Sequence, residues 1–251
     1  MNAPSPAGPS PAGPSPYAPP GFHGGLTPRV PATYKPLGWK TTATTLAIAA
    51  SIVATLLVVL LGVMSVRAPP NERLAIFVVL GLVSILQNAA AMLGAVLFLM
   101  WIHHASKNAH SLGRDGLEYT PGWSVAWWFV PVLGLWKPYQ VVAEIWRASD
   151  PTAAAANDAF DTSWRKRNVS ALLPVWWATY LLSGFIGFAG LTLIVQSAAH
   201  RVVGVTIPAA VAFATSLVLS IACATLLDVM MRAIDRRQQI TRQRLDDPDD
   251  A

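Results

Sequence analysis

The sequence predicts an all-α, polytopic membrane protein: four transmembrane helices in two antiparallel hairpins, with a proline-broken element between the second and third helices. Composition indicates this class, because 53% of the 251 residues are hydrophobic and only 12% are charged, about half the charged share of an average soluble domain. Four apolar runs also reach the ~20 residues that a helix needs to cross a bilayer. These runs cover residues 41–66, 74–101, 172–197 and 203–231.

The distribution of basic residues predicts the orientation of these helices. With the N-terminus in the cytoplasm, fifteen Lys and Arg residues fall in cytoplasmic segments, and only Arg67, Arg73 and Arg201 fall in outer loops. Cytoplasmic loops carry such an excess of positive charge, so both termini and the central region are predicted to be cytoplasmic. The bias explains the net charge of +5 without a nucleic-acid partner. A basic inner surface would instead attract anionic lipid headgroups.

Two polar tails flank the membrane domain, which is predicted over residues 37–235. Residues 1–36 hold two copies of Pro-Ser-Pro-Ala-Gly, a composition that favours a disordered, proline-rich cytoplasmic tail with polyproline II character. This tail is either a solvated spacer or a ligand for an aromatic groove. Residues 236–251 are predicted to be a polar tail that starts as an extension of the last helix. The helical pattern of the second run likewise continues past the bilayer, to His110.

A tryptophan-rich element over residues 120–149 separates the second and third runs. Thr120 followed by Pro121 is typical of a helix start, and we expect that helix to continue to about Val130. Pro131 then breaks it, and Pro138 opens a second helix. Five of the ten tryptophans of the chain lie in this element.

The position of this element relative to the membrane has two interpretations. A fifth crossing is disfavoured, because it would place the basic C-terminal cluster outside, and because ten helical residues cover only ~15 Å. An interfacial elbow and a shallow re-entrant loop both stay open. On the four-helix topology all ten tryptophans lie near the cytoplasmic side, which we interpret as an aromatic slab at that interface.

Several sequence motifs follow one another from Phe98 to Ser149. They are FLMW at 98–101, Asn108, YTPGWSVAWWFVP at 119–131, LWKPYQ at 135–140 and EIWRAS at 144–149, followed by Pro174, Trp176 and Trp177 at the third run and by the Arg237–Gln238 pair after the fourth. Together these motifs resemble the bacterial membrane family catalogued as domain of unknown function 4328. His104 stands where the family pattern leads us to expect arginine. The resemblance implies a multi-pass protein of the bacterial inner membrane and supplies neither an activity nor a cofactor.

The polar residues form no recognisable catalytic motif, so we expect no enzymatic activity, no cofactor and no metal. His103 and His110 share a helix face, but no carboxylate or thiol lies at ligand spacing beside them. We interpret them as interfacial polar residues. Gln87 and Asn88 lie midway along the second run, where they either line a polar path or hydrogen-bond between helices.

Two further patterns concern packing. Small residues recur in the third run, at Ser183, Gly184, Gly187 and Gly190, and allow close approach of another helix. The only formal charge in the four runs is Asp228, which is expected to pair with Arg232 one turn on.

The signature segment contains one charged pair, Glu144 and Arg147. They belong either to a solvated stripe on an amphipathic helix or, with Asn108, to a buried polar cluster that joins the central element to the end of the second helix. Both interpretations stay open at this point.

The leading functional hypothesis is a non-enzymatic interaction or regulatory module at the cytoplasmic leaflet. Its expected partners are anionic lipid headgroups and either a partner protein or a second copy of the chain. The alternative is a small transporter or channel-like protein in which the central element is re-entrant. The candidate interaction residues are Asn108, Pro121, Trp123, Trp127, Trp128, Pro131, Trp136, Pro138, Tyr139, Glu144, Trp146 and Arg147.

Overall fold

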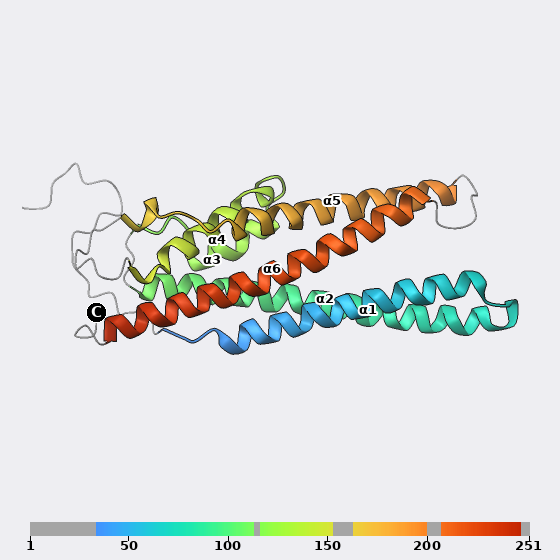
Figure 1. Ribbon diagram of the computed structural model, residues 1–251, viewed down its shortest axis with the longest axis horizontal. Coiled ribbons are helices and arrows are strands. Elements are labelled where there is room, and N and C mark those ends of the chain that lie inside the picture. Colours follow the sequence, from blue (N-terminus) through green and yellow to red (C-terminus); the bar gives the residue numbers. More distant parts are fainter. Residues whose placement is uncertain (1–33, 113–115, 153–162, 200–206, 247–251) are drawn as a thin grey trace, which may run out of the picture. The chain divides into compact units, whose positions relative to one another are not determined.

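The computed structural model describes residues 34–112, 116–152, 163–199 and 207–246, and these residues form helices and no strands. Four helices are long and apolar enough to cross a membrane, so the predicted all-α membrane class is confirmed. They are α1 (Gly38–Arg67), α2 (Pro70–Ser111), α5 (Leu172–Ala199) and α6 (Ile207–Asp246) (Figure 1). Nearly all of the predicted N-terminal tail lies outside the described residues.

α1 and α2 lie side by side (Figure 1). The chain leaves α1 at Ala68, whose backbone N–H donates to the carbonyl of Met64. Pro70 then begins α2, where its missing N–H costs nothing because the first N–H groups of a helix have no intrahelical partner. α2 packs closely on α1 at Gly94, where a Cβ would lie 3.2 Å from the Ile48 side chain.

α5 and α6 form the second contacting pair, and small residues bring them together. A Cβ at Gly187 would lie 2.9 Å from the Ser216 hydroxyl, and one at Gly190 would lie 3.2 Å from Ala212. The Ser216 hydroxyl donates to the carbonyl of Ser183 at 2.9 Å. The predicted small-residue contact is therefore found at these positions. Gly184 differs, because nothing lies within 4 Å of its Cβ position.

Asp228 on α6 connects the two helix pairs. It forms the predicted ion pair with Arg232, at 2.9 Å. It also accepts a hydrogen bond of 2.6 Å from the Thr45 hydroxyl of α1, which the sequence did not reveal because 183 residues separate the two.

The core is concentrated toward the C-terminal parts of α2 and α6. Trp101, Ile102, Met230 and Ile234 are fully buried there. In contrast, at most 6% of the residues in the most apolar stretch of each long helix are buried. Such surfaces suit lipid, which is as apolar as the side chains that it surrounds.

Between α2 and α5 the chain forms α3 (Pro121–Ala126), two 3₁₀ turns, η1 (Trp127–Phe129) and η2 (Leu133–Leu135), and α4 (Lys137–Ala148). Thr120 caps α3, accepting from the Trp123 N–H at 3.4 Å. α3 is shorter than predicted, because the chain tightens into η1 before it reaches Pro131.

The break between η1 and η2 is a tight turn centred on Val132, which has a φ of +65°. The Leu133 N–H donates to the carbonyl of Pro131, and the Gly134 N–H donates to that of Val130. A positive φ is costly for a β-branched residue, so the turn is held by its surroundings.

A short 3₁₀ turn, η4 (Ser163–Lys166), precedes α5. At the other end, α6 ends at Asp246 and so includes the start of the polar tail predicted over residues 236–251. Gln238 and Thr241 are fully buried, so this part of the chain packs into the folded domain.

Candidate functional site

A buried amide network joins four segments at the end of the molecule where α2 and α6 terminate. The Asn108 amide group donates to the carbonyl of Lys35 at 2.8 Å and to the Gln238 side-chain oxygen at 3.1 Å. The Gln238 amide group donates to the carbonyl of Ala105 and to the Ser149 hydroxyl, at 3.0 and 3.1 Å. Each amide thus uses both of its N–H donors. The network connects the segment before α1, which contains Lys35, with α2, the end of α4 and α6.

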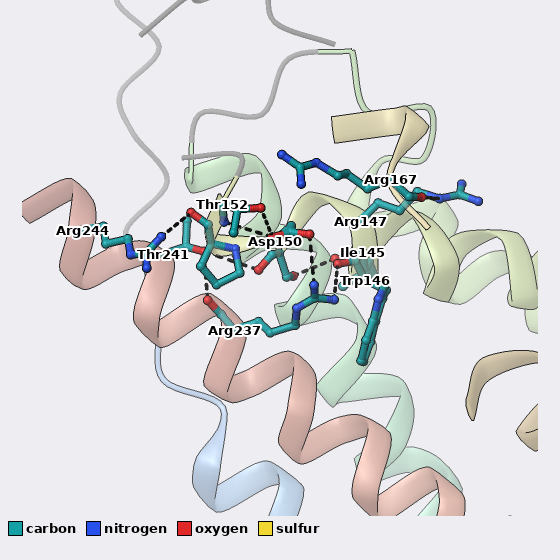
Figure 2. Close-up of polar contacts among 11 residues, drawn as sticks. Ile145, Trp146, Arg147, Asp150, Thr152, Arg167, Arg237, Thr241 and Arg244 are labelled. Atoms are coloured by element: carbon teal, nitrogen blue, oxygen red, sulfur yellow. Dashed lines mark hydrogen bonds and ion pairs between the residues drawn. The ribbon is translucent and has the colours of Figure 1, made fainter. Parts of the chain in front are cut away.

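Arg237 holds the end of α4 beside this network (Figure 2). Its guanidinium group donates to the Asp150 carboxylate at 3.1 Å and to the carbonyl of Trp146 at 3.3 Å, and it lies 4.3 Å from the centre of the Trp146 ring. One planar group therefore makes an ion pair, a backbone hydrogen bond and a cation–π contact.

The carboxylate of Asp150 is stabilised in its charged form. Burial alone would raise its pKa, but hydrogen bonds from Thr152 and the charges of Arg237 and Arg167 outweigh burial and lower the pKa below its ordinary value. Thr241 and Arg244 extend the contact by donating to the carbonyls of Ser149 and Pro151 (Figure 2).

Glu144 joins α4 to the segment that precedes α3. Its side chain is buried, and its two oxygens accept hydrogen bonds from the backbone N–H groups of Glu118 and Tyr119 at 2.6 and 3.2 Å. Burial raises the pKa of this carboxyl above its ordinary value, although the two hydrogen bonds act in the opposite direction. Glu144 thus fixes residues 118 and 119 as a strap across α4.

Lys137, at the start of α4, reaches the same strap. Its ammonium group donates to the Tyr119 hydroxyl at 3.0 Å and lies 3.6 Å from the Glu118 carboxylate. The Tyr119 hydroxyl in turn donates to the Gln140 side chain at 3.0 Å. The face of α4 that carries Lys137, Gln140 and Glu144 therefore has an ordered polar lining.

A cavity of about 510 Å³ lies along this face. Its walls come from the strap, from α4 and from η4, and they carry both signs of charge. The lining residues are Glu118, Tyr119, Lys137, Tyr139, Gln140, Ala143, Glu144, Arg147, Trp164 and Arg165. We call this space the α4 cavity.

Aromatic side chains hold the other side of the central element. Trp128 makes edge-to-face contacts with Phe98 of α2 and with Trp177 and Tyr180 of α5, at ring-centre distances of 5.1 to 6.1 Å. The Trp177 indole donates to the carbonyl of Leu135 at 3.0 Å. The turn itself is apolar and open, with Phe129 71% exposed and Val132 68% exposed.

The predicted residues are distributed over four places. Tyr139, Glu144 and Arg147 line the α4 cavity, whereas Asn108 belongs to the amide network and Trp146 lies under Arg237. The remaining predicted residues belong to the aromatic part and the helix starts: Pro121, Trp123, Trp127, Trp128, Pro131, Trp136 and Pro138.

Both interpretations of Glu144, Arg147 and Asn108 need correction. Glu144 is buried rather than part of a solvated stripe. The three residues also do not form one cluster, since Glu144 binds the strap, Asn108 binds Gln238, and the Arg147 Nε donates to the carbonyl of Arg167 at 3.1 Å. Sequence reasoning placed these residues at the right helices and gave them the wrong partners.

Several residues of the site were not among the predicted site residues, including Gln238 and Arg237, which were noted only as a family motif, and Ser149, Trp164, Arg165 and Thr241. Ser149 ended a recognised motif, and the burial of Thr241 in a basic, polar segment has no signal in the sequence. Trp164 and Arg165 come close to α4 only through the fold.

The described histidines contact backbone carbonyls. His103 Nδ1 lies 2.9 Å from the carbonyl of Pro121, and His110 Nδ1 lies 2.8 Å from that of Ser106. Among the described residues no three His, Cys, Asp or Glu side chains are grouped so as to hold a metal ion.

Three comparisons relate the chain to known proteins. No curated protein and no solved structure matches the chain. A family model with the description "domain of unknown function (DUF4328)" matches residues 71–236, which is most of the chain and runs from the start of α2 into the C-terminal part of α6. The protein therefore belongs to the DUF4328 family.

Proposed function

We propose that this protein is a non-enzymatic interaction module of the bacterial inner membrane, with both termini and the central element on the cytoplasmic side. The orientation is supported by the excess of Lys and Arg that it places in the cytoplasm. On this orientation the amide network, Arg237 and the α4 cavity all lie at the cytoplasmic leaflet.

The α4 cavity is the observation that carries the proposal. Its size of about 510 Å³ is that of a small-molecule or headgroup site. Contacts outside the cavity hold its walls in place, because Glu144 binds the strap and Arg237 binds the end of α4. A preordered polar surface loses little freedom when a ligand or partner binds, and this favours recognition.

The open aromatic turn supports the same position in the membrane. Phe129, Val132 and Trp136 are exposed, although the Trp128 contacts hold the turn against α2 and α5. Exposed apolar and tryptophan side chains gain free energy at the boundary between headgroups and acyl chains. A shallow insertion of this turn would keep the α4 cavity at the headgroup level.

Photo-crosslinking in native membranes tests the proposal. A photoreactive amino acid replaces Tyr139, which lines the α4 cavity, or Leu82, which is exposed on the apolar part of α2. We expect an adduct of defined mass at position 139 only, whether a bound molecule, a partner protein or a second copy. No adduct, or the same bulk-lipid adducts at both positions, would contradict an interaction site at the cavity.

A further inference from the structure

We propose that the α4 cavity binds a phosphate group, held by the guanidinium groups of Arg147 and Arg165. This inference rests on the proposed function, since it names the ligand class of the same cavity. Arg147 belongs to the last turn of α4 and Arg165 to η4, and both line the cavity. The fold therefore brings two arginine residues from separate segments to the wall of one cavity.

The charges around the cavity leave these two groups available to an anion. Lys137 is engaged with Glu118 and Tyr119, and both oxygens of Glu144 accept backbone hydrogen bonds. Within the described residues, neither Arg147 nor Arg165 has a carboxylate within ion-pair distance. The two carboxylates of the cavity thus have hydrogen-bonding or ion-pair partners of their own, and Arg165 acts on Glu144 only through its charge, without an ion pair.

Neighbouring groups hold both arginines in place. The Arg147 Nε donates to the carbonyl of Arg167, which fixes the stem and leaves the two terminal NH₂ groups as donors. The Arg165 guanidinium lies 5.6 Å from the ring centre of the buried Trp164. It also lies against Gly116, which has a φ of +74° and where a Cβ would approach the Arg165 Nη2 to 3.0 Å.

A phosphate group matches this arrangement better than a simple anion does. The guanidinium fork binds two oxygens of a phosphate at once, and two arginines together can engage three. The volume of about 510 Å³ leaves room for an organic group attached to the phosphate. Such a ligand is either a phospholipid headgroup, which the cytoplasmic leaflet supplies, or a soluble phosphate ester.

Native mass spectrometry of the full chain in detergent separates these sources. One arm titrates phosphatidylglycerol in mixed micelles, with diacylglycerol as the phosphate-free lipid. The other arm titrates glycerol 3-phosphate, with glycerol as its control. Binding in the lipid arm identifies a headgroup, and binding in the soluble arm identifies a free phosphate ester. In either arm the phosphate-free compound is expected not to bind.

The double variant Arg147→Ala/Arg165→Ala provides the critical comparison. We expect its dissociation constant to rise about tenfold or more, because it loses charge-assisted hydrogen bonds from two residues. Arg236→Ala is the matched control, since Arg236 is exposed on α6 outside the cavity lining, and its affinity should stay within about twofold of wild type. If the double variant is poorly folded, Arg147→Lys/Arg165→Lys replaces it, with an intermediate loss expected.

Two results would overturn the inference: no phosphate-dependent binding in either arm, or a folded double variant that binds as tightly as wild type. Photo-crosslinks at position 139 would be unaffected by these results if the cavity instead holds a protein. The proposed function would then stand, and only the ligand class assigned here would be wrong.

Discussion

The end of the molecule where α2 and α6 terminate and the apolar stretches of the long helices are packed differently. Where α2 and α6 end, side chains such as Trp101 and Gln238 are fully buried, and polar groups connect helices that are far apart in sequence. Along the apolar stretches at most 6% of residues are buried, and the surface is formed by exposed Leu, Val, Ile and Phe side chains. The bilayer can hold an apolar helix in place without specifying its neighbour. Specific assembly of the helices therefore depends mainly on the polar end.

The largest expected loss of stability at the polar end comes from Gln238→Ala. The substitution removes one hydrogen bond each from the Asn108 amide, the Ser149 hydroxyl and the carbonyl of Ala105 in a buried site. Asn108 keeps its bond to Lys35, and Ser149 keeps its bond to Ile145. Leaving buried polar groups unpaired costs about 1–3 kcal/mol each, and we expect about 2–4 kcal/mol in total. Unfolding of the purified protein by SDS in mixed micelles measures this loss.

Gln239→Ala is the matched control for Gln238→Ala. Gln239 is the neighbouring residue, is exposed, and donates only to Asp235 of its own helix. A loss within about 0.5 kcal/mol is expected, as for other exposed substitutions. Equal losses for the two variants would show that the amide network does not distinguish this end of the molecule.

The next effect is expected from Arg237→Ala, which removes the ion pair with Asp150 and the contact with the Trp146 ring. A charged hydrogen-bonding group of this kind contributes about 1–3 kcal/mol, and Arg236→Ala should change stability little.

The pH dependence of stability provides a second readout of the Arg237–Asp150 ion pair. Because the folded pKa of Asp150 is lowered, its contribution is complete above the ordinary value of 3.8 and is lost as the pH falls through the folded value. This acid-side loss should be smaller in Arg237→Ala, and an unchanged slope would contradict the assigned ion pair.

Gly187→Ala tests whether the apolar part has any specific contact. The new methyl group would lie 2.9 Å from the Ser216 hydroxyl and would disturb its hydrogen bond to Ser183. We expect a loss of about 1 kcal/mol, as for moderate overpacking. Gly184→Ala should be neutral or slightly stabilising, because its Cβ position is open and alanine favours helix. The same SDS unfolding assay compares them, and a larger loss for Gly184→Ala would invalidate the packing of α5 on α6.

The sequence predicted the apolar half of the molecule better than the polar half. Hydrophobic run length determines a membrane-spanning helix almost by itself, and proline and threonine mark the starts of α3 and α4 through local chemistry. The partners of Glu144 and Asn108 depend instead on segments 25 to 130 residues away. Their types indicated only that they would need partners when buried. The α4 cavity was not predictable for the same reason, since Trp164 and Arg165 reach it only through the fold.

The smallest expected change in stability is that of Glu144→Gln. This variant is informative because the sign of the pH dependence of stability tests whether Glu144 is buried. Burial raises the folded pKa of Glu144 above the ordinary value of 4.5, so the folded protein binds this proton more tightly than the unfolded chain does. Stability from this group is therefore complete at low pH and decreases as the pH rises from 4.5 through the folded value, opposite to the effect of Asp150. Glutamine has the shape of glutamate and no charge to bury, but it loses one of the two hydrogen bonds to the strap. We therefore expect the free energy of unfolding to change by about 1 kcal/mol or less at neutral pH. The difference between wild type and variant, measured by unfolding from pH 4 to pH 8, should shift in favour of the variant as the pH rises. A difference independent of pH would mean that Glu144 is solvated, and the strap would then not fix the wall of the α4 cavity.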